Sequence, residues 1–87
     1  MLLQFYGLEC GWCHKMVPFV ERLEKEHGIK VEKYEVWHNE ENAKKMAEYA
    51  DGVCAGVPFF FNTETKQAIC GAAPYEALVE WAGINNE

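Results

Sequence analysis

Short apolar runs alternate with amphipathic segments along this chain of 87 residues, and that alternation constrains the fold more than any other feature. Short runs rich in aromatic and β-branched residues are typical of strands, whereas apolar residues that recur on one helical face are typical of amphipathic helices. The apolar runs predict strands at Leu2–Tyr6, Ile29–Trp37, Pro58–Phe61 and Gln67–Cys70. The amphipathic segments predict helices at about Cys10–His27 and Glu40–Tyr49, and a last helix opened by Pro74.

Turn and cap residues support these boundaries. Gly28 closes the first predicted helix, Asn39 can cap the second, and the polar turn Asn62–Lys66 joins the last two strands as a hairpin. Strands separated by helices generally lie parallel through right-handed crossovers, whereas a hairpin is antiparallel. The order βαβαββα therefore predicts an α/β fold with a four-stranded mixed sheet and helices on both of its faces.

Length and composition indicate one folded domain that spans residues 1–87. Hydrophobic residues make up 49% of the chain and charged residues 25%, which is ordinary for a globular domain. A domain of this size buries only roughly 60 to 65% of the surface of its unfolded chain, so its stability margin is small. The four cysteines could form a disulfide that stabilises such a domain.

The net charge excludes one class of partner and the hydropathy pattern another. With 14 acidic and 8 basic side chains the formal charge is -6, which repels phosphate backbones, so we expect no nucleic-acid partner. No apolar stretch approaches the ~20 residues of a membrane span, and Met1 leads into LLQFYG without the basic region of a signal peptide. We therefore expect a cytoplasmic protein without membrane association, in a compartment where cysteines are more often catalytic or metal-binding than structural.

The segment Cys10-Gly11-Trp12-Cys13 lies where the first strand gives way to the first helix. Free N–H groups and the positive dipole end of a helix favour a thiolate there, which predicts a lowered pKa for Cys10 and a nucleophilic role. The spacing lets Cys13 attack a mixed disulfide formed by Cys10. We expect Cys10 exposed and Cys13 shielded, because the helix buries successive residues as it turns under the sheet edge. Gly11 leaves room for a substrate, and Trp12 offers either a flat apolar contact or ordinary surface packing.

A C-x-x-C pair is also typical of zinc sites, which need a second pair of ligands. The other cysteines, Cys54 and Cys70, are sixteen residues apart in different predicted elements. We therefore expect no metal and no cofactor. Free cysteines commonly fill small apolar sites, and this is the expectation for Cys54 and Cys70. A hairpin centred on the polar turn would place Cys70 opposite Phe59, where it could act as a secondary redox thiol.

Three anchors make the chain resemble the thioredoxin family over most of its length. The first is CGWC at a strand-to-helix junction with Pro18 eight residues after Cys10; the second is Gly56-Val57-Pro58 before an apolar strand; the third is Gly71 after the hairpin, followed by a helix. The resemblance implies a thioredoxin-like domain and a protein thiol–disulfide oxidoreductase, an enzyme or electron carrier whose redox-active centre is Cys10 with Cys13.

The resemblance also implies a cis Val57–Pro58 bond, with a trans proline at the start of a strand as the alternative. In the family the backbone before this proline pairs with an extended substrate, so Gly11, Trp12, Val57, Pro58 and Gly71 are the predicted substrate-binding residues. The implied partners are protein disulfides and a thioredoxin-reductase-like or glutathione recycling system, and the implied state is a monomer.

Two departures from the family pattern concern the chemistry of the site. Gln4 stands where thioredoxins carry a buried acid on the strand before the motif, so Cys13 must lose its proton to water or with the help of Lys33 or His14, both of which are otherwise expected to be plain exposed side chains. Trp12 replaces the proline usual between the two cysteines, a change that shifts the redox poise of this fold.

Two alternative functions remain open from the sequence. Glutaredoxins share the short topology, but their signature of paired glycine and acidic residues is replaced here by Cys70-Gly71-Ala72-Ala73, which favours a protein dithiol partner over glutathione. The other alternative is a metal-binding or redox-inert interaction module on the same fold.

Overall fold

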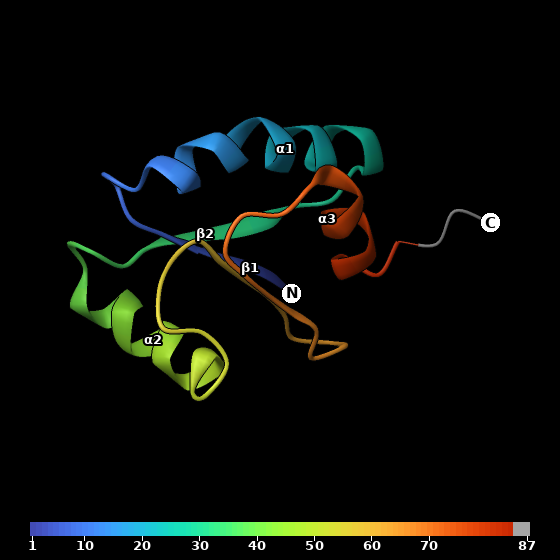
Figure 1. The fold of residues 1–87 in the computed structure, drawn as a ribbon. Coiled ribbons are helices and arrows are strands. Elements are labelled where there is room, and N and C mark those ends of the chain that lie inside the picture. The colour runs from blue at the N-terminus through green and yellow to red at the C-terminus, as the bar shows by residue number, and fades with distance from the viewer. Residues whose placement is uncertain (85–87) are drawn as a thin grey trace.

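The computed structural model describes residues 1–84 and contains four strands and three helices in the predicted order. The elements are β1 (Leu2–Tyr6), α1 (Gly11–His27), β2 (Val31–Glu35), α2 (Glu40–Ala50), β3 (Phe59–Asn62), β4 (Ala68–Cys70) and α3 (Tyr75–Trp81). Figure 1 shows the sheet in the middle of the molecule with helices on either side of it.

The strands form one mixed sheet in the order β2-β1-β3-β4. Strand β1 pairs in parallel with β2 and antiparallel with β3, and β3 pairs antiparallel with β4. Because β1 lies inside the sheet, Leu3, Gln4 and Phe5 are buried. The loop that leaves the end of β1 therefore starts from a fixed, central point of the fold.

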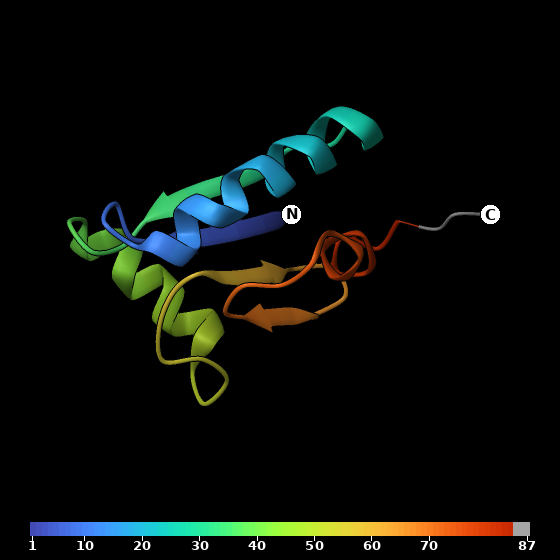
Figure 2. The same cartoon turned by 45° about the horizontal axis from the view of Figure 1, so that its top comes forward.

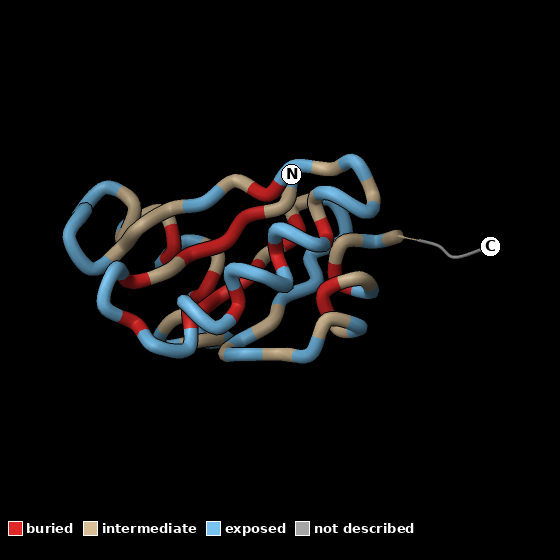
Figure 3. Tube along the Cα trace, turned by 90° about the horizontal axis from the view of Figure 1, so that it is seen from above, coloured by how far each residue is buried: buried red, intermediate tan, exposed pale blue. Residues whose placement is uncertain are grey.

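The sheet separates two apolar cores, one on each face. Helices α1 and α3 cover one face, where Met16, Leu23, Phe60 and Trp81 are among the buried contacts. Helix α2 covers the other face, over Phe5 and other core residues (Figure 2). Buried positions recur along α1 at Cys13, Met16, Val20 and Leu23, and Figure 3 shows buried stretches alternating with exposed ones along the chain. This arrangement confirms the predicted α/β fold with helices on both faces.

Helix α1 begins and ends as its sequence predicts. Cys10 is the residue before the first turn, and its sulfur accepts a hydrogen bond from the N–H of Cys13. Gly28 ends the helix in the left-handed region at φ 63°, where a residue without Cβ is favoured. Val17 and Phe19, although apolar, are 41% and 38% exposed on this helix.

Strand β2 is shorter than the predicted Ile29–Trp37. Its first residues are used to end α1, because the N–H of Ile29 donates to the carbonyl of Glu24. At the other end the Glu35 carboxylate accepts hydrogen bonds from the N–H groups of Trp37 and His38. A side chain that bonds to its own downstream backbone competes with sheet pairing and turns the chain away.

The hairpin of β3 and β4 has the register that the polar turn predicts, with Cys70 opposite Phe59. Strand β3 begins at Phe59 because Pro58 has no N–H to donate to a ladder. Buried Asn62 ends the strand, accepting hydrogen bonds from the turn and donating one to the Trp81 carbonyl in α3. No helix within residues 1–84 is long and apolar enough to cross a membrane.

Candidate active site

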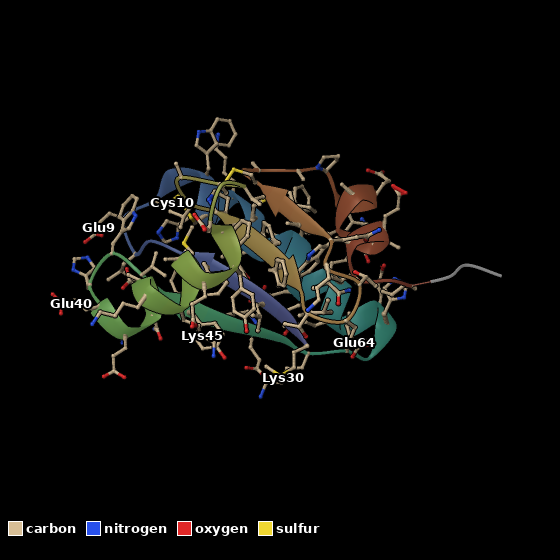
Figure 4. The ribbon with its side chains drawn as sticks, turned by 90° about the horizontal axis from the view of Figure 1, so that it is seen from below. Glu9, Cys10, Lys30, Glu40, Lys45 and Glu64 are labelled. Carbon is tan, nitrogen blue, oxygen red and sulfur yellow. A yellow bond between two sulfur atoms is a disulfide. The ribbon has the colours of Figure 1, made fainter. Side chains whose placement is uncertain are left out.

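Cys10 and Cys13 lie side by side at the N-terminus of α1 and form a disulfide with 5.2 Å between their Cα atoms. The short loop from β1 positions Cys10, whose N–H donates to the Gly7 carbonyl. Cys10 is 6% exposed and Cys13 3%. Our expectation of an exposed Cys10 is therefore wrong for this oxidised form, in which the two sulfurs bury one another. Figure 4 shows Cys10 at the same end of the molecule as Glu9.

Backbone groups from two segments face the Cys10 sulfur. The N–H of Cys13 lies 3.1 Å from Sγ and donates to it, and the Val57 carbonyl oxygen lies 3.9 Å away on the other side. The helix dipole and a directed N–H both stabilise negative charge on a sulfur at this position. The site therefore combines a reducible sulfur pair with a polar group able to hold a thiolate.

The predicted substrate-binding residues differ in exposure. Gly11 is exposed, and Trp12 is 61% exposed with Lys15 Nζ 4.5 Å from the centre of its ring. Val57 is half-buried and Pro58 is buried, and the bond between them is cis. Gly71 is half-buried, and its N–H donates to the Pro58 carbonyl at 2.8 Å. Trp12 is thus the predicted substrate-binding residue with a large exposed side chain, and Val57 is the one whose carbonyl lies near the Cys10 sulfur.

Glu35 joins the two loops beside the site, a role that the sequence analysis missed. Its carboxylate accepts hydrogen bonds from the N–H groups of Leu8, Trp37 and His38, at 2.8 to 3.2 Å. Burial disfavours the ionised form, but these three donors and the nearby His38 outweigh it, so the pKa of Glu35 lies below its usual value. An acid at the end of a parallel strand is the one signal that could have indicated this role.

Trp37 covers Gly7, three residues before Cys10. A Cβ placed on Gly7 would collide with the Trp37 ring, although 53% of Trp37 is exposed. Gly7 itself is buried beneath the ring. A flat aromatic side chain therefore lies directly against the backbone of the loop that carries Cys10, and only a glycine permits this close approach.

Glu9, next to Cys10, forms an ion pair with His38 at 2.8 Å. The hydrogen bond that the Glu9 carboxylate accepts from the His38 ring, and then the charge of Glu9, raise the pKa of His38. Side-chain ligand atoms of Glu9, His38 and Glu35 lie within 4.8 Å of one another, but the Glu35 oxygens are occupied by backbone donors. The Glu9–His38 ion pair and the backbone hydrogen bonds to Glu35 therefore account for the closeness of these three side chains.

Gln4 lies behind the disulfide. It is 3% exposed, and its Oε1 atom has no hydrogen-bond partner among residues 1–84. With Cys13, His14 and Lys33 it lines a cavity of about 230 Å³. His14 bonds to the Leu8 carbonyl at 2.6 Å, and Lys33 pairs with Glu24 at 3.0 Å. Both candidate proton-transfer residues therefore reach the cavity while held by other partners.

Cys54 and Cys70 form a second disulfide, with 5.5 Å between their Cα atoms. Our expectation that each is a free cysteine in a small apolar site is therefore wrong. The loop after α2 must return to the start of β3, and the hairpin register brings Cys70 back to the same place, opposite Phe59. Two residues sixteen apart meet because of this return, which their spacing alone does not reveal.

The C-x-x-C disulfide follows a central parallel strand, opens a helix and lies beside a cis-proline loop. These features define a class, the thioredoxin-like dithiol proteins. Among curated proteins, the M-type chloroplastic thioredoxin of Pisum sativum is 30% identical over 80 residues, which cover 92% of this chain and 46% of that protein. Its counterpart from Spinacia oleracea is 31% identical over 81 residues, 92% of this chain and 44% of that protein.

The thioredoxin of Rickettsia typhi is 26% identical over 81 residues, 93% of this chain and 76% of that protein. The chain thus spans slightly less than half the length of the two plant relatives. No protein-family model matches the chain. Over most of its length the chain is thus similar in sequence to thioredoxins, and its fold is thioredoxin-like.

Proposed function

We propose that the chain is a protein thiol–disulfide oxidoreductase that reduces disulfides in polypeptides through Cys10 and Cys13. The observation that carries this proposal is the Cys10–Cys13 disulfide at the N-terminus of α1, with the Cys13 N–H directed at the Cys10 sulfur. The thioredoxins to which the chain is similar support the same class of reaction.

In the proposed reaction the Cys10 thiolate attacks a substrate disulfide, and one substrate sulfur leaves as a thiolate. The Cys13 thiolate then attacks Cys10 in the mixed disulfide, which forms the Cys10–Cys13 bond and releases the second substrate thiol. The substrate gains two electrons and two protons, and the protein is left oxidised. A reductase of the thioredoxin-reductase type, or a glutathione system, returns the two electrons.

Substrate recognition is proposed to involve the exposed Trp12 ring and the backbone around Val57 and Gly71. The Val57 carbonyl already faces the Cys10 sulfur at 3.9 Å, so an extended segment that pairs with this backbone would bring its own disulfide to the nucleophile. We further propose that the protein acts as a monomer in a reducing compartment such as the cytoplasm.

An insulin-type disulfide reduction assay with dithiothreitol tests the activity, and we expect clear acceleration that Cys10→Ser abolishes. Cys13→Ser should instead accumulate a mixed disulfide on Cys10, because the resolving sulfur is missing. The absence of acceleration by the intact protein would exclude the proposed reaction. Equal activity with a glutathione mixed disulfide and glutathione as sole donor would instead favour a glutaredoxin-like enzyme.

A further inference from the structure

The second disulfide is more accessible than the first. Cys70 is exposed and Cys54 half-buried, whereas Cys10 and Cys13 are 6% and 3% exposed. Exposed disulfides are generally among the labile ones, because thiols in solution can reach and reduce them. A thiol in solution therefore meets the Cys54–Cys70 bond at the protein surface.

This disulfide fastens a loop that has few other attachments. The segment 51–57 between α2 and β3 is exposed at Asp51, Gly52, Val53, Ala55 and Gly56. At its start, the N–H groups of Val53 and Cys54 donate to the Ala50 carbonyl. At its end, the Pro58 carbonyl accepts from Gly71, the residue after Cys70. Among residues 1–84 hydrogen bonds thus hold the loop backbone at 53–54 and at the neighbouring Pro58, and the covalent bond from Cys54 to β4 reinforces the first of these attachments.

The same loop forms one side of the candidate active site. Val57, three residues after Cys54, places its carbonyl oxygen 3.9 Å from the Cys10 sulfur. Gly71 connects the other end of the disulfide to Pro58. The Cys54–Cys70 bond therefore lies within three residues, on either chain segment, of the backbone beside Cys10.

We propose that Cys54–Cys70 is a second redox site, reduced by small dithiols in solution, and that its oxidised state keeps the Val57 loop in position to receive substrate at Cys10. The second half of this proposal rests on the proposed oxidoreductase function. The first half does not, because the accessibility of the bond is independent of what Cys10 does.

The reduction balances with a dithiol as the reductant. One thiolate of the dithiol attacks the exposed Cys70 sulfur, the Cys54–Cys70 bond breaks, and Cys54 leaves as a thiolate and takes up a proton. Its sulfur lies 3.2 Å from the Gly56 carbonyl oxygen, which can accept the new S–H. The second thiolate of the reagent then closes the reagent's own disulfide and releases the Cys70 thiol. The protein gains two electrons and two protons, and the dithiol loses them.

The first experiment measures the reduction of the Cys54–Cys70 disulfide in a protein that lacks the Cys10–Cys13 pair. The double variant Cys10→Ser with Cys13→Ser is equilibrated in a series of dithiothreitol redox buffers, quenched with acid, alkylated and analysed by mass spectrometry. We expect labelling of Cys54 and Cys70 to rise together and reversibly while the far-UV circular dichroism stays native. A bond that resists dithiothreitol until denaturant is added would overturn the proposal. A parallel series in glutathione shows whether a monothiol also suffices.

The second experiment measures the effect on catalysis. The double variant Cys54→Ser with Cys70→Ser is compared with the wild type in single-turnover reduction of a protein disulfide, without added dithiol. Because an untethered loop must be ordered on binding, we expect the substrate concentration that gives half the limiting rate to rise about fivefold or more, with the limiting rate constant little changed. An unchanged half-saturating concentration in the folded variant would overturn the control of Cys10 by the second site.

If the serine variant does not fold, wild-type protein with the second bond reduced under native conditions replaces it in this comparison. Failure of the wild type itself to reduce any protein disulfide would refute the proposed function. In that event the control of Cys10 by Cys54–Cys70 fails with it, while reversible reduction of the second bond in the first experiment still supports the second redox site.

Discussion

Glu9 and His38 place a titrating ion pair directly beside Cys10. Their side chains meet at 2.8 Å, and this contact raises the pKa of His38. A histidine whose pKa is raised by folding contributes stability that is present below its ordinary value of about 6.5 and is lost as pH rises through the higher folded value. At the residue scale, the charge of the ion pair next to Cys10 therefore changes as His38 titrates above the ordinary histidine pKa.

We expect Glu9→Gln to lower the pKa of His38 towards the ordinary histidine value, because the variant removes the charge and weakens the hydrogen bond. The titration of the His38 ring protons followed by NMR measures this change. Glu64→Gln is the matched control, since Glu64 lies at the opposite end of the molecule from Glu9 in Figure 4. Identical His38 titrations in Glu9→Gln and the wild type would contradict the ion pair.

A second prediction at this scale concerns the contact of Gly7 with Trp37. In Gly7→Ala the new methyl group has no room beneath the indole ring, so the ring must swing outward or the loop must shift. We expect a loss of about 1 to 3 kcal/mol of stability, as for overpacked sites, together with a displaced Trp37 indole N–H resonance. Gly56→Ala, where a Cβ meets nothing within 4 Å, should change neither quantity by a comparable amount.

At the element scale, one side chain joins α1 to the start of β2. The Glu24 carboxylate accepts hydrogen bonds from the Val31 N–H at 2.9 Å and from Lys33 Nζ at 3.0 Å. Burial disfavours its charged form, but these two donors and the charges of Lys33 and Lys30 outweigh burial and hold the pKa of Glu24 below its usual value. This contact fixes where the edge strand β2 begins against the helix that carries Cys10.

We expect Glu24→Gln to destabilise the protein by about 1 to 2 kcal/mol at pH 7, because a charged acceptor becomes neutral. The contribution of Glu24 is present above the ordinary glutamate pKa of about 4.3 and is lost as pH falls through its lower folded value. The difference from the wild type in urea unfolding should therefore vanish in acid. Exposed Glu21 on the same helix gives the control variant Glu21→Gln, and a pH-independent difference would refute the assignment.

At the scale of the whole molecule, the sheet divides the apolar residues into two cores, and β3 supplies side chains to both. Phe60 is fully buried between the sheet and the helices α1 and α3, with its ring 5.4 Å from that of Trp81. Phe61 points to the opposite face, is half-buried, and packs on Tyr49 at 4.8 Å. A domain this small has few such contacts to lose.

We expect Phe60→Ala to cost about 3 to 5 kcal/mol, a large fraction of the 5 to 15 kcal/mol typical of folded domains. Phe61→Ala should cost clearly less, because part of that ring already contacts water. Urea unfolding followed by circular dichroism at equal m-values measures both variants. Equal losses would mean that the two faces of the sheet contribute alike to stability.

The sequence by itself determined the elements, their order and the C-x-x-C pair at a strand-to-helix junction. These features depend on local signals: apolar runs such as Leu2–Tyr6, the helical spacing of Met16, Val20 and Leu23, and the cap residues Gly28 and Asn39. Even the pairing of Cys70 with Phe59 followed from the length of one turn. Local signals of this kind act between residues close in sequence, so they can be read without the fold.

Only the tertiary structure decided how residues distant in sequence meet. It brought Cys54 to Cys70, placed the Val57 carbonyl beside Cys10, laid Trp37 on Gly7 and turned the Glu35 carboxylate to three backbone donors. It also buried Cys10, which its place at a helix terminus had led us to expect at the surface. Each of these contacts depends on where loops return after crossing the sheet. The position of each loop is stabilised by packing over the whole domain, so it cannot be predicted from a short stretch of sequence.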